Sequence, residues 1–170
     1  PQLKWLNMQM YALLRPMPVN PHAVSIIGCD RATKQDTELV RLLSENGFAL
    51  HDINNCQSYA AFQQIAESAL HLSYIPAARA AAAETAKRFG AKHLHLPASF
   101  AYDEITENYR QLCAALGIAM PDFSADISAA EAALDAAYAE IGDMEIAIDF
   151  TAVTQPFSLA KLLCAHHFNV

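Results

Sequence analysis

Short apolar runs alternate with amphipathic segments through the first two thirds of the chain. Each run holds five or six residues rich in β-branched and aliphatic side chains, which is typical of a strand buried in a sheet. The segments between them carry apolar residues at helical spacing, and a glycine closes two of these segments. This alternation predicts a Rossmann-like, doubly wound parallel sheet with flanking helices. The predicted strands are 23–27, 48–53, 69–73 and 92–96, and the predicted helices are 35–46, 59–67 and 76–89.

The start of the chain follows a different pattern. Three prolines fall between residues 16 and 21, and proline cannot continue a regular helix or a central strand. We therefore expect residues 1–22 to form a connecting arm. After the fourth strand, an amphipathic helix is predicted over 102–116, because Gly117 follows its last apolar residue.

The pattern of the last fifty residues suggests that a second domain begins there. Ser128 and Glu131 have the spacing of a capping box, which predicts a helix that opens there and ends near Gly142. A strand at 145–150 and a helix from 156 to about 167 then start a further β-α unit, and no stop signal follows. The chain therefore reads as part of a longer protein. The expected sections are an arm at 1–22, a Rossmann-like central domain at 23–120, a linker and helix at 121–143, and a truncated second Rossmann-like domain at 144–170.

Charge narrows the classes of partner. Eighteen acidic residues outnumber eleven basic ones, the formal net charge is −7, and the basic residues are scattered. A protein of this kind lacks the positive footprint that a nucleic acid or an anionic membrane surface requires. The sequence also shows neither a signal peptide nor 18 consecutive apolar residues. We expect a cytoplasmic protein that binds neither nucleic acid nor membrane.

Motifs for common cofactors are missing from the sequence. There is no glycine-rich dinucleotide or P-loop motif, and the four cysteines are too far apart for a zinc site. His93 and His95 are two residues apart in a predicted strand, so both point to one face. Two histidines without a third ligand do not define a metal centre, and no metal ligand is predicted.

Parallel sheets bind ligands beyond the carboxyl ends of their strands. The loops that leave the predicted strands are therefore the places to search for a site. Asp30 and Arg31 in the first loop are also explained as ordinary solvated loop charges. No catalytic residue can be named from these loops. The candidate ligand-binding residues are Cys29, Asp30, Arg31, Ser73, Tyr74 and Ser99.

Three stretches of the sequence resemble a known family, and one of them is the segment 74–90 with its helix that ends in KRFG. AVSIIG at 23–28, a polar loop, and VRLLSENGF at 40–48 are similar to the opening of the second domain of nitrogenase component 1 proteins. The segment PASFAY at 97–102 and the helix that ends at Gly117 are similar to a later part of the same domain. The resemblance covers most of residues 20–117. This family includes the molybdenum-iron protein subunits, the cofactor-assembly scaffold pair and the dark-operative protochlorophyllide reductases.

The resemblance carries expectations about function. Members of the family have three Rossmann-like domains around a metallocluster or substrate site, and they receive electrons from an ATP-dependent iron protein. The intact protein would then hold an iron-sulfur cluster or metallocluster and would pair with a homologous or identical subunit. Cys29, Asp30 and Arg31 would face the cavity between domains. This chain alone would be inactive and is not expected to hold the cluster.

One position departs from the family. Counting back from Gly90 puts Tyr74 where cofactor-bearing members have a cysteine ligand. A phenol is not the soft donor that an iron-sulfur metallocluster prefers. Cys29 or Cys56 could supply a substitute thiolate from a neighbouring loop. The alternatives to an oxidoreductase component are a scaffold that holds a metallocluster without turnover, which needs such thiolates, and an α/β ligand-binding domain with no redox role.

Overall fold

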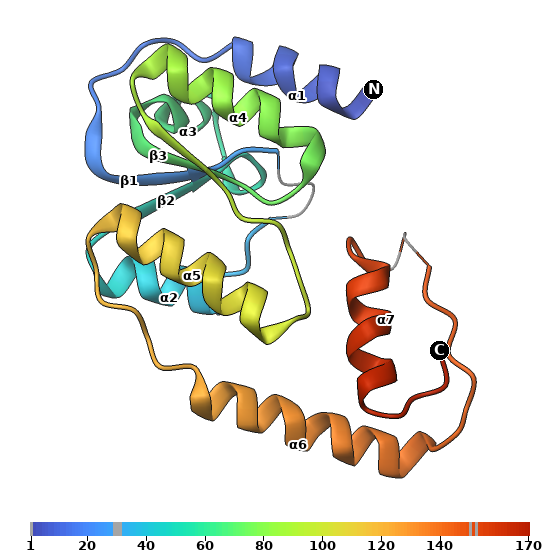
Figure 1. The fold of residues 1–170 in the computed structure, drawn as a ribbon. Coiled ribbons are helices and arrows are strands. Elements are labelled where there is room, and N and C mark those ends of the chain that lie inside the picture. The colour runs from blue at the N-terminus through green and yellow to red at the C-terminus, as the bar shows by residue number, and fades with distance from the viewer. Residues whose placement is uncertain (1, 29–31, 150, 152) are drawn as a thin grey trace. The chain divides into compact units, whose positions relative to one another are not determined.

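A computed structural model describes residues 2–28, 32–149, 151 and 153–170 of the chain (Figure 1). The chain divides into two compact units, Pro1–Pro97 and Ala98–Val170, which are described separately below. Three of the predicted ligand-binding residues, Cys29, Asp30 and Arg31, lie outside the described residues.

A four-stranded, all-parallel sheet forms the centre of the first unit, which confirms the predicted Rossmann-like α/β fold. The strand order is β2-β1-β3-β4, so the chain moves outward from β1 to β2 and then crosses back to the other side of β1. The strands are β1 (Asn20–Ile26), β2 (Ala49–Asp52), β3 (Ser68–Ser73) and β4 (Lys92–His95). The helices after β1 are α2 (Glu38–Glu45), α3 (Tyr59–Gln63) with the 3-10 turn η2 (Gln64–Glu67), and α4 (Pro76–Phe89).

The direction of each crossover assigns the helices to the faces of the sheet. Right-handed crossovers place α2 on one face and α3 and α4 on the other, as Figure 1 shows. Ile27 extends the pairing of β1 by donating its N–H to the carbonyl oxygen of Leu72 at 2.8 Å. Its side chain packs with Ala81 and Ala82 of α4. Alternation along the strand therefore turns Ser25 toward the α4 face as well.

Residues 2–12 form a helix, α1 (Gln2–Ala12), where the sequence predicts a connecting arm. The prolines at 16–21 stop this helix but do not prevent it, because they lie beyond its last turn. Tyr11 and Leu14 are buried in the core between α1, α3 and α4. Arg88 of α4 donates to the carbonyl oxygens of Ala12 and Leu14, which have no partner within α1. The helix is thus part of the first unit.

The second unit consists of three helices and their connections. They are α5 (Tyr102–Leu116), α6 (Ser124–Ile141) and α7 (Pro156–Ala165). The capping-box prediction is wrong, since α6 begins four residues earlier and Ser128 lies inside it, with its hydroxyl donating to the carbonyl of Ser124. The strand expected at 145–150 is wrong as well. Over its described part it forms only an isolated parallel bridge between Glu145 and Asn169.

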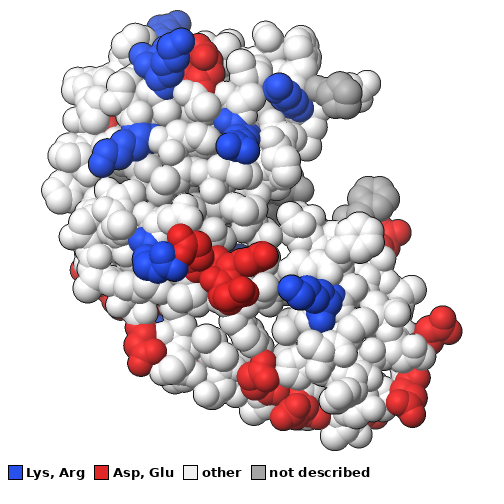
Figure 2. Space-filling model, viewed as in Figure 1, with Lys and Arg blue, Asp and Glu red and all other residues white. Residues whose placement is uncertain are grey.

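Charge is divided unevenly between the two units. Nine of the eleven Lys and Arg residues lie in the first unit, whereas eleven of the eighteen Asp and Glu residues lie in the second. Figure 2 shows basic side chains over the region of α1 and α4. Within the described residues, no helix is both long enough and apolar enough to cross a membrane.

Candidate functional site

The strand order fixes where a ligand site is expected in the first unit. The first crossover runs from β1 to β2, and the second returns past β1 to β3, so the direction of winding reverses between β1 and β3. Open α/β sheets bind ligands at such a point, in the crevice beyond the carboxyl ends of the strands. The loop that follows β1 and the short connection from Ser73 into α4 border this crevice. We refer to this place as the carboxyl edge.

Helix α4 approaches the carboxyl edge closely at Gly28. This glycine has φ +73°, and a Cβ placed on it would lie 2.2 Å from the Cβ of Ala78 and 3.0 Å from Oδ1 of Asn7. Its N–H donates to the hydroxyl of Tyr11 at 2.8 Å. Asn7, Tyr11 and Ala78 are all buried. Helices α1 and α4 therefore hold the beginning of the loop after β1, and only glycine fits there.

A buried carboxylate connects the loops after β1 and β2. Oδ2 of Asp52 accepts hydrogen bonds from the N–H of Thr33 at 2.8 Å and from its hydroxyl at 2.7 Å. Oδ1 accepts from the N–H and side-chain amide of Asn54 at 2.9 and 3.2 Å. Asp52 is 2% exposed, and these four donors satisfy both of its side-chain oxygens within the protein. This arrangement ties Thr33, which precedes α2, to the end of β2.

Five polar side chains form a row on the face of the sheet that α4 covers. Ser25 Oγ lies 2.5 Å from Nδ1 of His71, and Ser73 Oγ lies 3.0 Å from Nε2 of His93 and 2.9 Å from Nδ1 of His95. The strand register pairs His71 with His93 and Ser73 with His95. We call this set the serine-histidine cluster. The expectation that His93 and His95 share a face is confirmed, since both contact one hydroxyl.

Burial keeps the cluster uncharged at neutral pH. It lowers the pKa of His71 to about 4, and the nearby His93 adds to this effect. Burial likewise lowers the pKa of His93 and of His95, and the positive charge of Arg79 contributes to both shifts. A hydrogen bond with the backbone of Ser73 partly opposes the lowering of the pKa of His95. The three imidazoles are therefore neutral hydrogen-bonding groups and not a pool of positive charge.

The described residues do not offer ligands for an iron-sulfur cluster. The thiol of Cys56 donates to the carbonyl oxygen of Asp52 at 3.3 Å, and burial together with the Asp52 carboxylate raises its pKa. Cys113 is buried on α5, where burial raises the pKa of its thiol, and Cys164 lies exposed on α7. Within the described ranges, His, Cys, Asp and Glu form no group of three that could hold a metal ion. Cys29, the fourth cysteine of the chain, lies outside the described residues.

Three predicted ligand-binding residues fall within the described part. Ser73 ends β3 and is fully buried, with its hydroxyl engaged in the serine-histidine cluster. Tyr74 follows it at the carboxyl edge and is half-buried. Ser99 lies in the second unit, where its Oγ accepts from the N–H of Ala101 and donates to Glu104. These contacts make Ser99 part of the start of α5.

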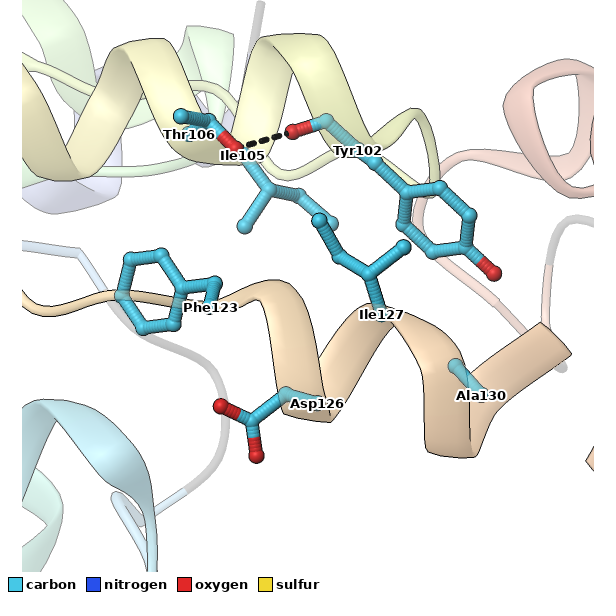
Figure 3. Close-up of a pocket in the computed structure, with 7 residues that line it drawn as sticks. All are labelled: Tyr102, Ile105, Thr106, Phe123, Asp126, Ile127 and Ala130. Carbon is cyan, nitrogen blue, oxygen red and sulfur yellow. Dashed lines mark hydrogen bonds between the residues drawn. The ribbon is translucent and has the colours of Figure 1, made fainter.

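Figure 3 shows a separate cavity of about 210 Å³ within the second unit. Side chains from α5, including Tyr102 and Ile105, face Phe123 and Ile127 across it. Burial and the neighbouring Glu131 raise the pKa of the Tyr102 phenol. Apart from Tyr102, Thr106 and Asp126, the lining is apolar, and Figure 3 shows the Asp126 carboxylate pointing away from the side chains of α5. The carboxyl edge of the first unit is therefore the better candidate site.

Sequence reasoning overlooked several residues of the site. Asp52 was assigned to a strand, and its role depends on Thr33, which is nineteen positions away. The serine-histidine cluster could have been anticipated from the sequence. Serine or histidine occupies alternate positions at the ends of β3 and β4, at Ser73, His93 and His95. Polar residues on both neighbouring strands, on one face, indicate that they are hydrogen-bonded to one another.

No protein-family model matches the chain, and no curated protein does either.

Proposed function

We propose that this chain is the central domain, with the start of the next, of a cytoplasmic oxidoreductase similar to nitrogenase component 1. Its carboxyl edge would line a metallocluster or substrate cavity in the intact protein. Electrons would come from an ATP-dependent iron protein, and a homologous or identical subunit would complete the assembly. The ligands of the cluster would belong to other parts of the protein.

Two independent arguments put the site at the same strand ends, and their agreement is the observation that most supports this proposal. The strand order puts the reversal point between β1 and β3. The resemblance assigns cavity-facing roles to the loop after β1 and to Tyr74, which leave the same two strands. Asp52 binds Thr33 and Asn54, and Gly28 packs tightly against Ala78, so these described residues of the edge are held in place, as a site for positioned chemistry requires.

A cofactor-assembly scaffold is supported less well by the described residues. Such a scaffold needs thiolates that point into the cavity. Among the described cysteines, Cys56 comes soonest after a strand of the sheet, β2. The pKa of its thiol is raised and the thiol donates a hydrogen bond to a carbonyl oxygen, and both effects disfavour the thiolate. The oxidoreductase component therefore stays the leading proposal.

The proposal predicts the composition of the complete gene product. Expressed and purified without oxygen, it should contain iron and acid-labile sulfide, and its dithionite-reduced form should give an iron-sulfur electron paramagnetic resonance spectrum. The same preparation made with iron depletion serves as the control. A colourless, iron-free protein that is nevertheless folded would contradict the proposal and would favour a ligand-binding domain with no redox role.

A further inference from the structure

Arg79 occupies an unusual position on α4. It lies in the first turn of the helix, directly after the short connection from β3, and its side chain is exposed. Among the described residues it forms neither a hydrogen bond nor an ion pair. Other arginines of the chain are engaged, since Arg41 pairs with Glu38 and Arg88 binds carbonyl oxygens of α1. Within the described part of the chain, the guanidinium of Arg79 at the carboxyl edge therefore has no hydrogen-bond or ion-pair partner.

Among the residues that the structure describes, no carboxylate contributes to the pKa shifts of the three histidines in the serine-histidine cluster. His93 acts on His71, both His95 and Arg79 act on His93, and Arg79 also acts on His95. Ser25 is the uncharged neighbour of His71 from β1. The first turn of α4 also contains no acidic residue, and no side chain caps it. Among the described residues, the first turn of α4 thus brings a cation and unpaired backbone donors to this edge, where the carboxylate of Asp52 is already bound by Thr33 and Asn54.

The hydrogen bonds of Ser73 dictate which ring nitrogens are available to a ligand. They engage Nε2 of His93 and Nδ1 of His95, so Nδ1 of His93 and Nε2 of His95 make no contact with Ser73. A hydroxyl donates one proton and accepts another, so one ring accepts from Ser73 and the other donates to it. The ring that accepts must carry its own proton on its other nitrogen. Even in the neutral cluster, one of the two remaining nitrogens is therefore an N–H donor.

Deeper in the cluster, His71 carries a further unsatisfied group. It is fully buried, and its Nε2 has no hydrogen-bond partner among the described residues. The register sets His71 directly opposite His93. Buried polar atoms are rarely left unpaired in proteins, and an unpaired one calls for a missing water, ion or ligand.

We propose that Arg79, together with the imidazoles of His93 and His95, binds a small oxyanion, such as a phosphate or carboxylate group, at the carboxyl edge. Arg79 supplies the permanent charge and a planar pair of donors. The histidine N–H donates to a second oxygen. The bound anion favours protonation of the second ring, so binding takes up a proton and tightens as the pH falls. The site goes beyond the proposed function and does not depend on a cluster being present.

Calorimetric titration of the complete protein with inorganic phosphate, and separately with citrate, tests this site. We expect saturable binding of at least one anion at pH 6.5, with proton uptake and with weaker binding at pH 8. Because a hydrogen bond to a charged group contributes about 1.5–3 kcal/mol, Arg79→Gln should weaken binding at least tenfold. Lys87→Gln, which removes an exposed cation from the last turn of the same helix, should change it less than twofold.

A histidine variant distinguishes binding at this specific site from non-specific electrostatic attraction of the anion. His95→Gln should retain part of the affinity but lose most of the dependence on pH, while the circular dichroism spectrum stays that of the wild type. Equal binding by the wild type and Arg79→Gln would overturn the proposal, and so would the absence of saturable binding by either anion. Each of these outcomes can be read whether or not the protein contains iron, so failure here is distinct from failure of the proposed function.

Discussion

Replacing Gly28 with alanine should destabilise the first unit by about 3 kcal/mol. The new Cβ would lie 2.2 Å from the Cβ of Ala78, a distance that requires α4 or the loop to move. Overpacking of this kind costs about 1–3 kcal/mol. The left-handed φ of +73° adds about 1 kcal/mol, because a side chain at that backbone conformation contacts the following carbonyl oxygen.

Gly47 provides a matched control. Its φ of +75° is nearly the same, but nothing lies within 4 Å of a Cβ placed on it. Gly47→Ala should therefore cost only the conformational part, about 1 kcal/mol. Amide hydrogen exchange in β1 and β3 measures both variants against the wild type. Equal protection in the two variants would show that α4 does not approach Gly28 as closely as described.

The second large effect expected is a loss of stability in mild acid that depends on His71. Its pKa is about 4 in the folded protein, compared with 6.5 for an unperturbed histidine. Between these values the unfolded chain binds more protons than the folded one, so the free energy of unfolding falls as the pH falls. The contribution is complete above pH 6.5 and is lost by about pH 4. The difference in pKa corresponds to roughly 3 kcal/mol over that window.

A comparison of variants isolates this contribution. Urea unfolding followed by circular dichroism at pH 7.5, 6 and 5 should give a steep decrease for the wild type. His71→Gln should be less stable at pH 7.5, because it disturbs the bond to Ser25, but its decrease toward pH 5 should be much shallower. Carboxylates that titrate at lower pH affect both proteins alike and cancel. A slope in His71→Gln as steep as that of the wild type would show that His71 does not stay neutral in the folded state.

The elements of the first unit were predictable because each carries its own local signal. Alternating apolar runs and amphipathic segments locate β1 to β4 and α2 to α4, and Pro76 and Gly90 mark the two ends of α4. Helix α1 was missed because its stability comes from tertiary contacts. Tyr11 and Leu14 are buried against α3 and α4, which sequence periodicity alone does not show.

The candidate site was predictable only in outline. The rule for parallel sheets locates it at the strand ends and identifies Ser73 and Tyr74 correctly as edge residues. The partners of those residues come from distant parts of the chain, since Ser73 contacts His93 and His95 twenty or more positions away. The role of Arg79 depends on the placement of α4 over β3 and β4, which is a property of the fold.

Electron transfer tests the central claim most directly. The complete gene product, purified without oxygen, would be mixed with a reduced ATP-dependent iron protein from the same organism, and oxidation of the iron protein would be followed by stopped-flow absorbance. The proposed function predicts rapid oxidation that requires MgATP and is absent with MgADP. If the iron protein stays reduced with MgATP, although it reduces its own known acceptor in a parallel sample, the protein is not a component of this type.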